Sequence, residues 1–325
     1  MTRYLITGGA GFIGSHLSHL LLDQGHQVVA VDDLSTGSLE NIQLLKDRQN
    51  FTFVRETIMN SQVLDRLTSQ SEIVIHLAAT VGVRLIVEDP VRTIETNIMG
   101  SETVLKTANR YGCKVLIASS SEVYGKGVKV PFCEDDDRLM GSTHQSRWAY
   151  ATSKAVDEFL GLAYHRQFGL PVVIMRFFNT IGPGQIGRYG MVVPRLVRQA
   201  LSSEPLQVYG DGLQTRCFTD VLDVVKAVSK LSQHPDAVGQ IFNIGSTEEV
   251  SIYQLAERIL ALTGSHSVIQ LVPYEIAYAS GFEDMRRRVP CLDKIHRLIG
   301  YQPKFTLDDT LKRIIDYEKE SLSRD

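Results

Sequence analysis

The chain has 325 residues, of which 43% are hydrophobic, so it can bury a sizeable core in one large domain or two modest ones. Its formal net charge of -3, with no long basic stretch, argues against binding to nucleic acid or to an anionic membrane. No apolar run reaches the roughly 20 residues of a membrane-spanning helix. The four cysteines are far apart and form no CxxC pair, which predicts reduced thiols in the cytoplasm and neither a metal site nor a disulfide framework (Cys113, Cys133, Cys217 and Cys291).

The first half of the chain alternates short β-branched runs with longer segments of helical periodicity. Strands are predicted at Tyr4–Thr7, Gln27–Val31, Phe51–Val54, Ile73–Leu77, Lys114–Ser119 and Val172–Phe177. Helices are predicted at Ile13–Gln24, Val91–Tyr111 and Trp148–Phe168. Because parallel strands are joined by crossover helices, this alternation predicts an α/β fold with a Rossmann-type, doubly wound parallel sheet.

The pattern changes after Phe178, where a stretch rich in glycine and proline begins. The elements predicted beyond it are a helix at Val192–Ser203, a strand at Gln240–Ile244, and helices at Ser251–Thr263 and Leu307–Lys319. We expect one domain at 1–178, to which 217–247 returns, and a smaller C-terminal α/β lobe built from 179–216 and 248–325. This lobe is expected to close over the carboxyl edge of the sheet, where open α/β sheets bind ligands. The acidic run at 134–137 is interpreted as a solvated loop over that edge, not as a calcium site.

A glycine-rich turn directly follows the first predicted strand and opens the first predicted helix. Gly8, Gly11 and Gly14 allow a tight turn, close approach of the backbone to a pyrophosphate, and close packing of the helix on the strand. Phe12 and Ile13 begin the helix, whose free N–H groups and positive dipole end favour phosphate binding. This arrangement predicts a dinucleotide site.

Asp32, at the end of the second strand, indicates which dinucleotide binds. A carboxylate at this position can accept hydrogen bonds from both ribose hydroxyls and repels a 2′-phosphate, so NAD is favoured over NADP. Asp33 is adjacent and is an alternative for the same role.

Tyr150 and Lys154 lie four residues apart, on one face of a predicted helix. The ammonium group is expected to lower the pKa of the phenol from its ordinary value of about 10 toward the working pH, so that the tyrosinate can accept a hydroxyl proton. Lys154 can also hold the ribose beside the nicotinamide. A surface Tyr–Lys pair is the simplest alternative, but Ser120 and Ser121 follow the fifth strand and can orient the same hydroxyl group, which favours a catalytic site.

These motifs, in this order, resemble the extended short-chain dehydrogenases/reductases, the NAD-dependent enzymes that epimerise, dehydrate or decarboxylate nucleotide sugars. The matching segments are TGGAGFIG at 7–14, HLAA at 76–79, SEVYG at 121–125, YATSK at 150–154, RFFNTIGPG at 176–184 and GDGLQTRCFTDVLDV at 210–224. The resemblance implies that 1–178 binds NAD and that the C-terminal lobe binds a UDP-linked sugar. It also implies a homodimer in which the two long helices pair with those of a second copy.

The resemblance assigns further contacts to single residues. For NAD these are Leu77, Ala78, Ala79 and Asn97; for the nucleotide sugar they are Arg84, Asn179, Val193, Tyr209 and Arg216. One position departs from the family. Many members have an aspartate that contacts the adenine amino group where this chain has Thr57, and Glu56 is the candidate replacement.

Within the family, three features are most similar to the UDP-glucuronate decarboxylases, including those that make UDP-xylose or UDP-apiose. These are Glu122 before Val-Tyr-Gly, the RW-x-Y lead-in with Trp148, and a GF-x-D…R-x-P segment whose Arg288 matches the arginine that faces the sugar carboxylate. The resemblance implies oxidation at C4, loss of carbon dioxide from the 4-keto sugar with Arg288 at the carboxylate, and proton handling by Ser121 and Glu122.

Three alternatives remain open. Residues 82–84 resemble a segment of UDP-glucuronate 4-epimerases, which act on the same substrate and keep its carboxylate. Glu122 also occurs in 4,6-dehydratases, although many of them have aspartate where this chain has Ser121. A non-catalytic NAD-binding protein on the same fold is the alternative from another class, and an intact Tyr150 and Lys154 argue against it.

Overall fold

The computed structural model describes residues 1–80, 89–187, 190–277 and 285–323. Its centre is a seven-stranded sheet in the order β11-β6-β5-β4-β1-β2-β3, and every neighbouring pair is parallel. The strands are β1 (Arg3–Thr7), β2 (Gln27–Asp32), β3 (Phe51–Arg55), β4 (Ile73–His76), β5 (Lys114–Ser120), β6 (Val172–Phe177) and β11 (Gln240–Ile244). The predicted doubly wound parallel sheet is therefore confirmed.

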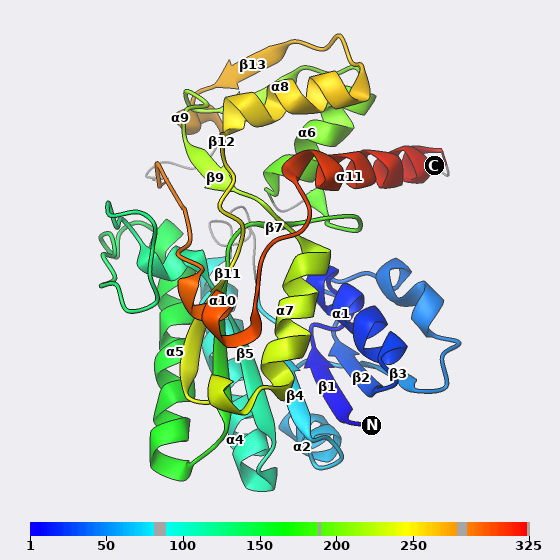
Figure 1. Cartoon of the computed structure of the whole chain (residues 1–325), viewed down its shortest axis with the longest axis vertical. Coiled ribbons are helices and arrows are strands. Elements are labelled where there is room, and N and C mark those ends of the chain that lie inside the picture. Colours follow the sequence, from blue (N-terminus) through cyan, green and yellow to red (C-terminus); the bar gives the residue numbers. More distant parts are fainter. Residues whose placement is uncertain (81–88, 188–189, 278–284, 324–325) are drawn as a thin grey trace.

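Helices cover both faces of the sheet (Figure 1). One face carries α1 (Phe12–Asp23), α7 (Val221–Gln233), α10 (Asp293–Ile299) and the 3-10 helix η1 (Glu40–Leu45). The other carries α2 (Ser61–Thr68), α4 (Pro90–Tyr111) and α5 (Arg147–Phe168). Successive strand residues point to opposite sides, so Tyr4 and Ile6 join the first core and Leu5 joins the second. Both sides of each central strand are thus buried, which explains why the strands are continuous apolar runs.

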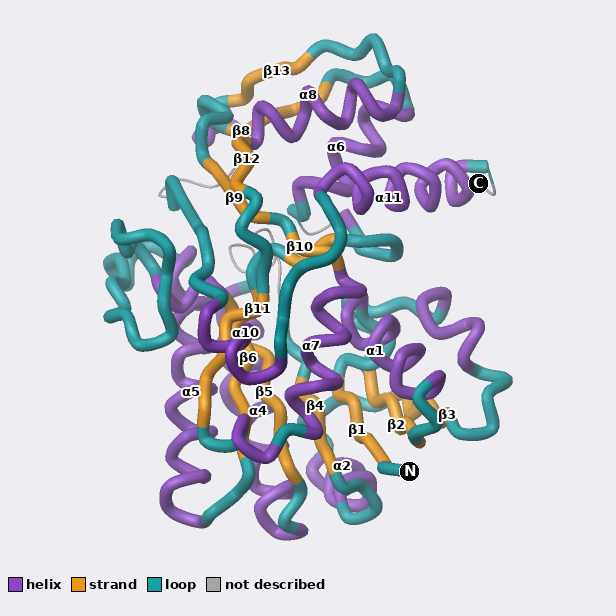
Figure 2. Tube along the Cα trace, in the orientation of Figure 1, coloured by secondary structure: helices purple, strands orange, loops and turns teal. Residues whose placement is uncertain are grey.

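A smaller lobe lies above the carboxyl ends of the strands (Figure 2). Its helices are α6 (Val192–Leu201), α8 (Ile252–Thr263), α9 (Tyr274–Ala277) and α11 (Leu307–Leu322). Its short strands are β8 (Leu206–Tyr209) paired with β13 (Ile269–Val272), β9 (Thr215–Cys217) paired with β12 (Glu249–Ser251), and β7 (Thr180–Ile181) paired with β10 (Thr219–Asp220). The lobe has its own core, in which α6, α8 and α11 pack together through residues such as Leu196, Leu255 and Leu311.

Several elements were not predicted from the sequence. The helix α7 is rich in valine, which favours strands, but Asp220 caps it by accepting a hydrogen bond from Leu222 N, and Val221, Val224 and Val228 recur at helical spacing. The helix α10 lies within 248–325, yet its Ile295 packs in the core of the sheet rather than in the core of the lobe.

The acidic run at 134–137 differs from the prediction at its first residue. Glu134 is buried, and its Oε1 accepts a hydrogen bond of 2.8 Å from Asn243 N on β11. Its carbonyl oxygen accepts another, of 2.9 Å, from Arg176. The run therefore begins as an anchor to the sheet, because a buried carboxylate needs such partners, and only Asp135 and Asp137 are exposed.

Among the described residues, none of the helices combines the length and the apolar character needed to cross a membrane. The same part of the chain holds no group of three or more His, Cys, Asp or Glu side chains arranged to bind a metal ion.

Candidate active site

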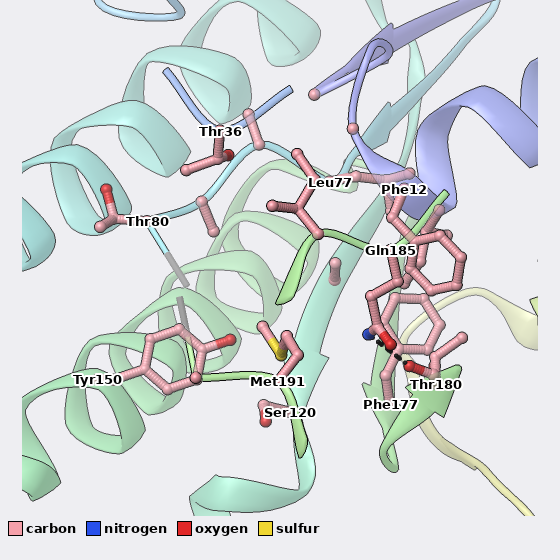
Figure 3. Close-up of a pocket in the computed structure, with 18 of the residues that line it drawn as sticks. Phe12, Thr36, Leu77, Thr80, Ser120, Tyr150, Phe177, Thr180, Gln185 and Met191 are labelled. Carbon is pink, nitrogen blue, oxygen red and sulfur yellow. Dashed lines mark hydrogen bonds between the residues drawn. The ribbon is translucent and has the colours of Figure 1, made fainter. Parts of the chain in front are cut away.

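A cavity of about 690 Å³ lies at the carboxyl ends of the parallel strands, between the sheet and the smaller lobe. The sheet contributes Asp32 from β2 and Ser120 from β5, and the lobe contributes Val193, Tyr209 and Arg216. In Figure 3, Tyr150 and Ser120 lie at one side of this cavity, while Phe12, Phe177 and Thr180 lie at the other. One cavity thus joins the predicted dinucleotide site, the Tyr–Lys pair and the lobe.

The glycine turn forms one end of the cavity. Gly8 has φ +71°, and a Cβ added to it would lie 2.8 Å from Ala78 N, so only glycine fits the turn here. Gly11 is the N-cap residue of α1, and no side chain caps the helix, so its first N–H groups are free for an anion. These residues fit the pyrophosphate of a dinucleotide.

Asp32 lies at the same end, with its carboxylate fixed by backbone donors. Its Oδ2 accepts from Ala10 N at 3.0 Å, and its Oδ1 accepts from Leu34 N at 2.8 Å. Burial raises the pKa of Asp32, and these two hydrogen bonds oppose the rise. The carboxylate keeps lone pairs for ribose hydroxyls because each oxygen can accept more than one hydrogen bond.

Replacement of Asp32 by asparagine should weaken NAD binding by roughly 10- to 100-fold, since hydrogen bonds to a charged group are worth about 1.5–3 kcal/mol. Titration calorimetry with NAD and NADP measures the effect, and the preference for NAD should shrink with the lost charge. Asp33→Asn is the matched control, because the exposed Asp33 carboxylate accepts from Ser35 N in its own turn. If Asp33→Asn were the more damaging change, Asp33 would hold the ribose instead.

Thr57 and Glu56 also line this end of the cavity. Glu56 Oε1 accepts from Thr57 N at 2.9 Å, and Glu56 Oε2 accepts from Asn60 Nδ2 at 3.0 Å, next to the Asn60 cap of α2. Glu56 therefore holds the start of α2, and its use as an adenine contact stays a prediction.

Lys154 points to a buried carboxylate that was not predicted to be part of the site. Its Nζ donates to Asp157 Oδ2 at 2.9 Å, and both side chains are almost completely buried. Asp157 raises the pKa of Lys154 against the lowering effect of burial, so the lysine stays charged. The charge beside Tyr150 is therefore maintained by a partner one turn along the same helix.

The pKa of Tyr150 differs in direction from the expectation. Burial raises it, and the charges of Glu122 and Asp157 add to the rise. Lys154 and a hydrogen bond with Ser120 lower it, as predicted, but burial has the larger effect. The charge of Lys154 alone therefore does not lower the pKa of the phenol below its ordinary value.

Arg288 enters the cavity from the segment that follows residue 284. Its Nη1 donates to Glu122 Oε1 at 2.7 Å and lies 3.4 Å from Ser121 Oγ. All three side chains are buried and line the cavity. Ser121 and Glu122 begin the 3-10 helix η2 (Ser121–Tyr124), directly after β5, so the end of a central strand fixes their position.

The segment that carries Arg288 is held by its neighbours. Arg216 Nη1 donates to Met285 O at 2.8 Å, and Thr215 N donates to Arg286 O at 2.8 Å. Arg287 forms a bidentate ion pair with Glu249 on the surface. Of the three consecutive arginines, only Arg288 lines the cavity.

A model of the NAD dependent epimerase/dehydratase family matches residues 4–245, which is most of the chain. The chain belongs to this family. The predicted NAD cofactor and the enzymatic nature of this epimerase/dehydratase family member are thereby confirmed.

Two curated relatives match this epimerase/dehydratase chain over nearly its full length. A UDP-N-acetyl-α-D-glucosaminuronate decarboxylase of Bacillus cytotoxicus is 43% identical over 98% of both chains. UDP-glucuronic acid decarboxylase 1 of Danio rerio is 35% identical over 98% of this chain and 73% of its own.

Solved structures of epimerases are also similar to this chain in fold. An epimerase from Methanothermobacter thermautotrophicus superposes with a TM-score of 0.91 at 30% identity, over 99% of this chain and 94% of its own. A UDP-glucuronic acid 4-epimerase from Bacillus cereus, solved with UDP-glucuronic acid and NAD, gives a TM-score of 0.89 at 31% identity, over 98% and 99% of the two chains.

Most site residues predicted for this epimerase/dehydratase chain do line the cavity, including Leu77, Ala78, Ala79 and Asn179. Asn97 does not. It is fully buried, its Oδ1 accepts from Thr80 N at 2.9 Å, and its Nδ2 donates to Ser153 Oγ at 3.1 Å, so it joins the loop after β4 to α5. Arg84 and residues 82–83 lie outside the described residues.

Several cavity-lining residues were missed from the sequence, among them Arg92, Gln185, Met191, Arg195 and Gln214. Two of them position the predicted Tyr209. The guanidinium of Arg195 lies 4.1 Å from its ring centre, and Gln214 Nε2 donates to its carbonyl oxygen at 2.9 Å. Val192 and Arg195 both line the cavity and are three residues apart in α6, and this helical spacing was the available signal for Arg195.

His76, the last residue of β4, is a buried imidazole that senses the charge of Lys154. Its Nδ1 lies 2.7 Å from Thr7 Oγ1, and its Nε2 lies 3.1 Å from Ser101 Oγ. Burial, with a smaller effect of the Lys154 charge, lowers the pKa of His76 to about 3. The imidazole therefore stays neutral in the folded protein over the physiological range.

The stability of the fold should consequently decrease at acidic pH. The contribution of His76 to the free energy of unfolding is complete above the ordinary histidine pKa of 6.5. It is lost as the pH falls from 6.5 toward 3, because the unfolded chain then binds a proton that the folded chain does not. The loss is about 1.4 kcal/mol per pH unit. Urea unfolding at a series of pH values measures it. His76→Asn should flatten the decline, whereas the exposed His144→Asn should not, and equal slopes in all three proteins would contradict this assignment.

Proposed function

We propose that this enzyme removes the C6 carboxylate of a UDP-linked uronic acid as carbon dioxide. The observation that carries the proposal is the buried cluster of Arg288, Glu122 and Ser121 in the same cavity as Tyr150. A buried guanidinium is a strong site for a carboxylate, because its planar fork of donors matches the two oxygens.

The similarity to curated relatives supports this substrate class and refines it. The chain is 43% identical to the UDP-N-acetyl-α-D-glucosaminuronate decarboxylase of Bacillus cytotoxicus, whose substrate name denotes a 2-acetamido sugar. It is 33–35% identical to UDP-glucuronic acid decarboxylases. UDP-glucuronate is the substrate expected from the sequence. We propose its 2-acetamido analogue as the preferred one.

We place NAD along the glycine turn, with Asp32 at its ribose and Lys154 at the ribose beside the nicotinamide. When bound, NAD would supply the hydride acceptor for oxidation at C4 and, as NADH, the hydride donor for its return, and its positive ring would lower the pKa of a nearby phenol. Tyr150 accepts the proton of the C4 hydroxyl through its phenolate oxygen and returns it at the end. Lys154 keeps positive charge beside that oxygen, and Ser120 holds it by a hydrogen bond.

Arg288 binds the C6 carboxylate, which stands β to the C4 ketone once C4 is oxidised. The C5–C6 bond breaks, its electron pair moves into the ketone as an enolate, and carbon dioxide leaves. C5 then takes a proton, and we assign its delivery to Glu122 and Ser121, which contact Arg288 in the cluster. The sugar undergoes no net oxidation, and the protein supplies position, electrostatics and the proton transfers at the C4 hydroxyl and at C5.

A 4-epimerase is the second candidate, and the similarity to the Bacillus cereus UDP-glucuronic acid 4-epimerase favours it. It would use the same C4 step and the same carboxylate contact. The difference lies in the fate of the 4-keto sugar, which must turn over in the cavity rather than lose C6.

The experiment is an incubation with UDP-N-acetylglucosaminuronate and, separately, UDP-glucuronate, with products followed by mass spectrometry. A product lighter by one carbon dioxide is expected from both, faster from the 2-acetamido sugar. A product of unchanged mass with a new retention time would replace decarboxylation by epimerisation. If neither sugar reacts, the proposed substrates are wrong.

We also propose that the chain acts as a cytoplasmic homodimer, with 1–178 serving NAD and the smaller lobe serving the UDP sugar. Support for the dimer comes from large apolar side chains that α4 and α5 expose, namely Val91, Ile94, Met99, Phe159 and Phe168. These two helices pack side by side in the chain, so a second copy can add two more. Light scattering in solution measures the mass of the assembly.

A further inference from the structure

A short parallel ladder joins the loop after η2 to the segment that carries Arg288. Phe132 N donates to Val289 O at 2.8 Å, and Cys291 N donates to Phe132 O at 2.8 Å, so Phe132 and Pro290 are bridge partners. Asn243 Nδ2 binds both segments of the ladder, since it donates to Phe132 O at 2.9 Å and to Cys291 O at 3.2 Å. The ladder is thus held from β11.

This ladder places two cysteines opposite each other. Cys133 follows Phe132, and Cys291 follows Pro290, so the two cysteines occupy the next register position. Side chains of neighbouring residues along a strand alternate between its two sides. Phe132 and Pro290 are buried, and Cys133 and Cys291 are half-buried, so both thiols face the outer side.

The spacing of such a ladder suits a covalent bond between the thiols. Paired strands lie about 4.8 Å apart, and disulfide-bonded cysteines have Cα atoms about 4.4–6.8 Å apart. The two thiols are also close enough to affect each other, because Cys291 is, after burial, among the causes that raise the pKa of Cys133 to about 11. Both are free thiols in the structure, and the other two cysteines, Cys113 and Cys217, are buried elsewhere.

We propose that Cys133 and Cys291 form a reversible disulfide site that ties the segment bearing Arg288 to the loop after η2. The oxidant is a low-molecular-weight disulfide such as oxidised glutathione. The Cys291 thiolate attacks one sulfur of the oxidant and releases one glutathione thiol, which leaves a mixed disulfide on Cys291. Cys133 then gives up its proton and attacks the Cys291 sulfur, and the second glutathione leaves as a thiol. Two cysteine thiols are oxidised, and one disulfide is reduced to two thiols.

The order of attack follows from the protonation of Cys133. Its raised pKa keeps it a thiol at neutral pH, and only a thiolate attacks a disulfide. In the second step, which takes place within one molecule, the closeness of Cys133 to Cys291 compensates for the small fraction of Cys133 that is a thiolate. The bond would fix residues 285–291 to the sheet side of the cavity without touching the side chains that line it.

The test is incubation of the intact protein with oxidised glutathione, followed by mass spectrometry of the whole chain and of its peptides. Wild type should lose two hydrogens, gain no glutathione, and give one linked pair of peptides containing Cys133 and Cys291. Dithiothreitol should reverse the change. The result is independent of which sugar the enzyme uses.

Single variants show which two cysteines pair. Cys133→Ser should trap one glutathione on Cys291, Cys291→Ser should trap none, and Cys113→Ser should behave like wild type. The oxidised wild type should also melt at a higher temperature than the reduced form, because a cross-link restricts the unfolded chain. Glutathione adducts on wild type, an unchanged mass, or a lower melting temperature after oxidation would overturn the proposal.

Discussion

Replacement of Tyr150 by phenylalanine should reduce kcat by roughly 10²- to 10⁴-fold while NAD and the UDP sugar still bind. The phenol oxygen is the group that takes the C4 proton, and phenylalanine keeps the ring that fills the same space. Fluorescence titration gives the NAD affinity, and the product assay gives kcat. Since the loss is in proton transfer, KM should change little by comparison.

Tyr164→Phe is the matched control for this change. Tyr164 lies on the same helix α5, and its ring contacts Phe168 away from the cavity. Near-normal turnover of Tyr150→Phe would exclude the tyrosine as the base. A parallel loss in Tyr164→Phe would mean that the helix, not the hydroxyl, is responsible.

Replacement of Arg288 by alanine should lower kcat/KM for a UDP-linked uronate by roughly 10²- to 10³-fold, the usual effect of removing one electrostatic donor from a closed site. The affinity for UDP itself, which has no carboxylate, should stay close to that of wild type. Arg288→Lys should restore part of the activity, because it returns the charge without the planar fork.

Arg287→Ala is the control for Arg288, since it removes the same side chain one residue earlier. Arg287 is on the surface and pairs with Glu249, so the expected effect on kcat/KM is small. Equal losses of uronate turnover and of UDP affinity in Arg288→Ala would indicate that the arginine supports the segment rather than the carboxylate.

Local motifs were enough to predict the cofactor end of the site. The glycine turn directly follows β1, and Asp32 ends β2; both strands are recognisable in the sequence as apolar runs. Parallel strands place their carboxyl ends at the same edge of the sheet, so the two features must meet there. Tyr150 and Lys154 share a helix face by spacing alone. These predictions depend on short-range geometry, which a sequence contains directly.

The partners of the charged residues depend on packing and could not be predicted in the same way. That Lys154 pairs with Asp157 follows from the burial of both, and the direction of the Tyr150 pKa follows from burial as well. Trp148 is one of the features that resemble the decarboxylases, but it does not line the cavity. It packs with Met285 and Met140, and thereby supports the segment of Arg288 from a distance.

Arg288 itself is separated from Glu122 by 166 residues, and only the resemblance to the family linked them in advance. The physical reason for their meeting is the hydrogen-bonded course of residues 285–291, held by Arg216, by Thr215 and by the Phe132 ladder. None of these backbone contacts has a sequence signature.

The most direct measurement of the central claim is the reaction of UDP-N-acetylglucosaminuronate in deuterium oxide, followed by mass spectrometry and proton NMR of the product. Decarboxylation through a 4-keto sugar predicts a product that has lost one carbon dioxide and carries one solvent deuterium, located at C5. A product that keeps its carboxylate, or one that loses carbon dioxide without taking up deuterium at C5, would contradict it.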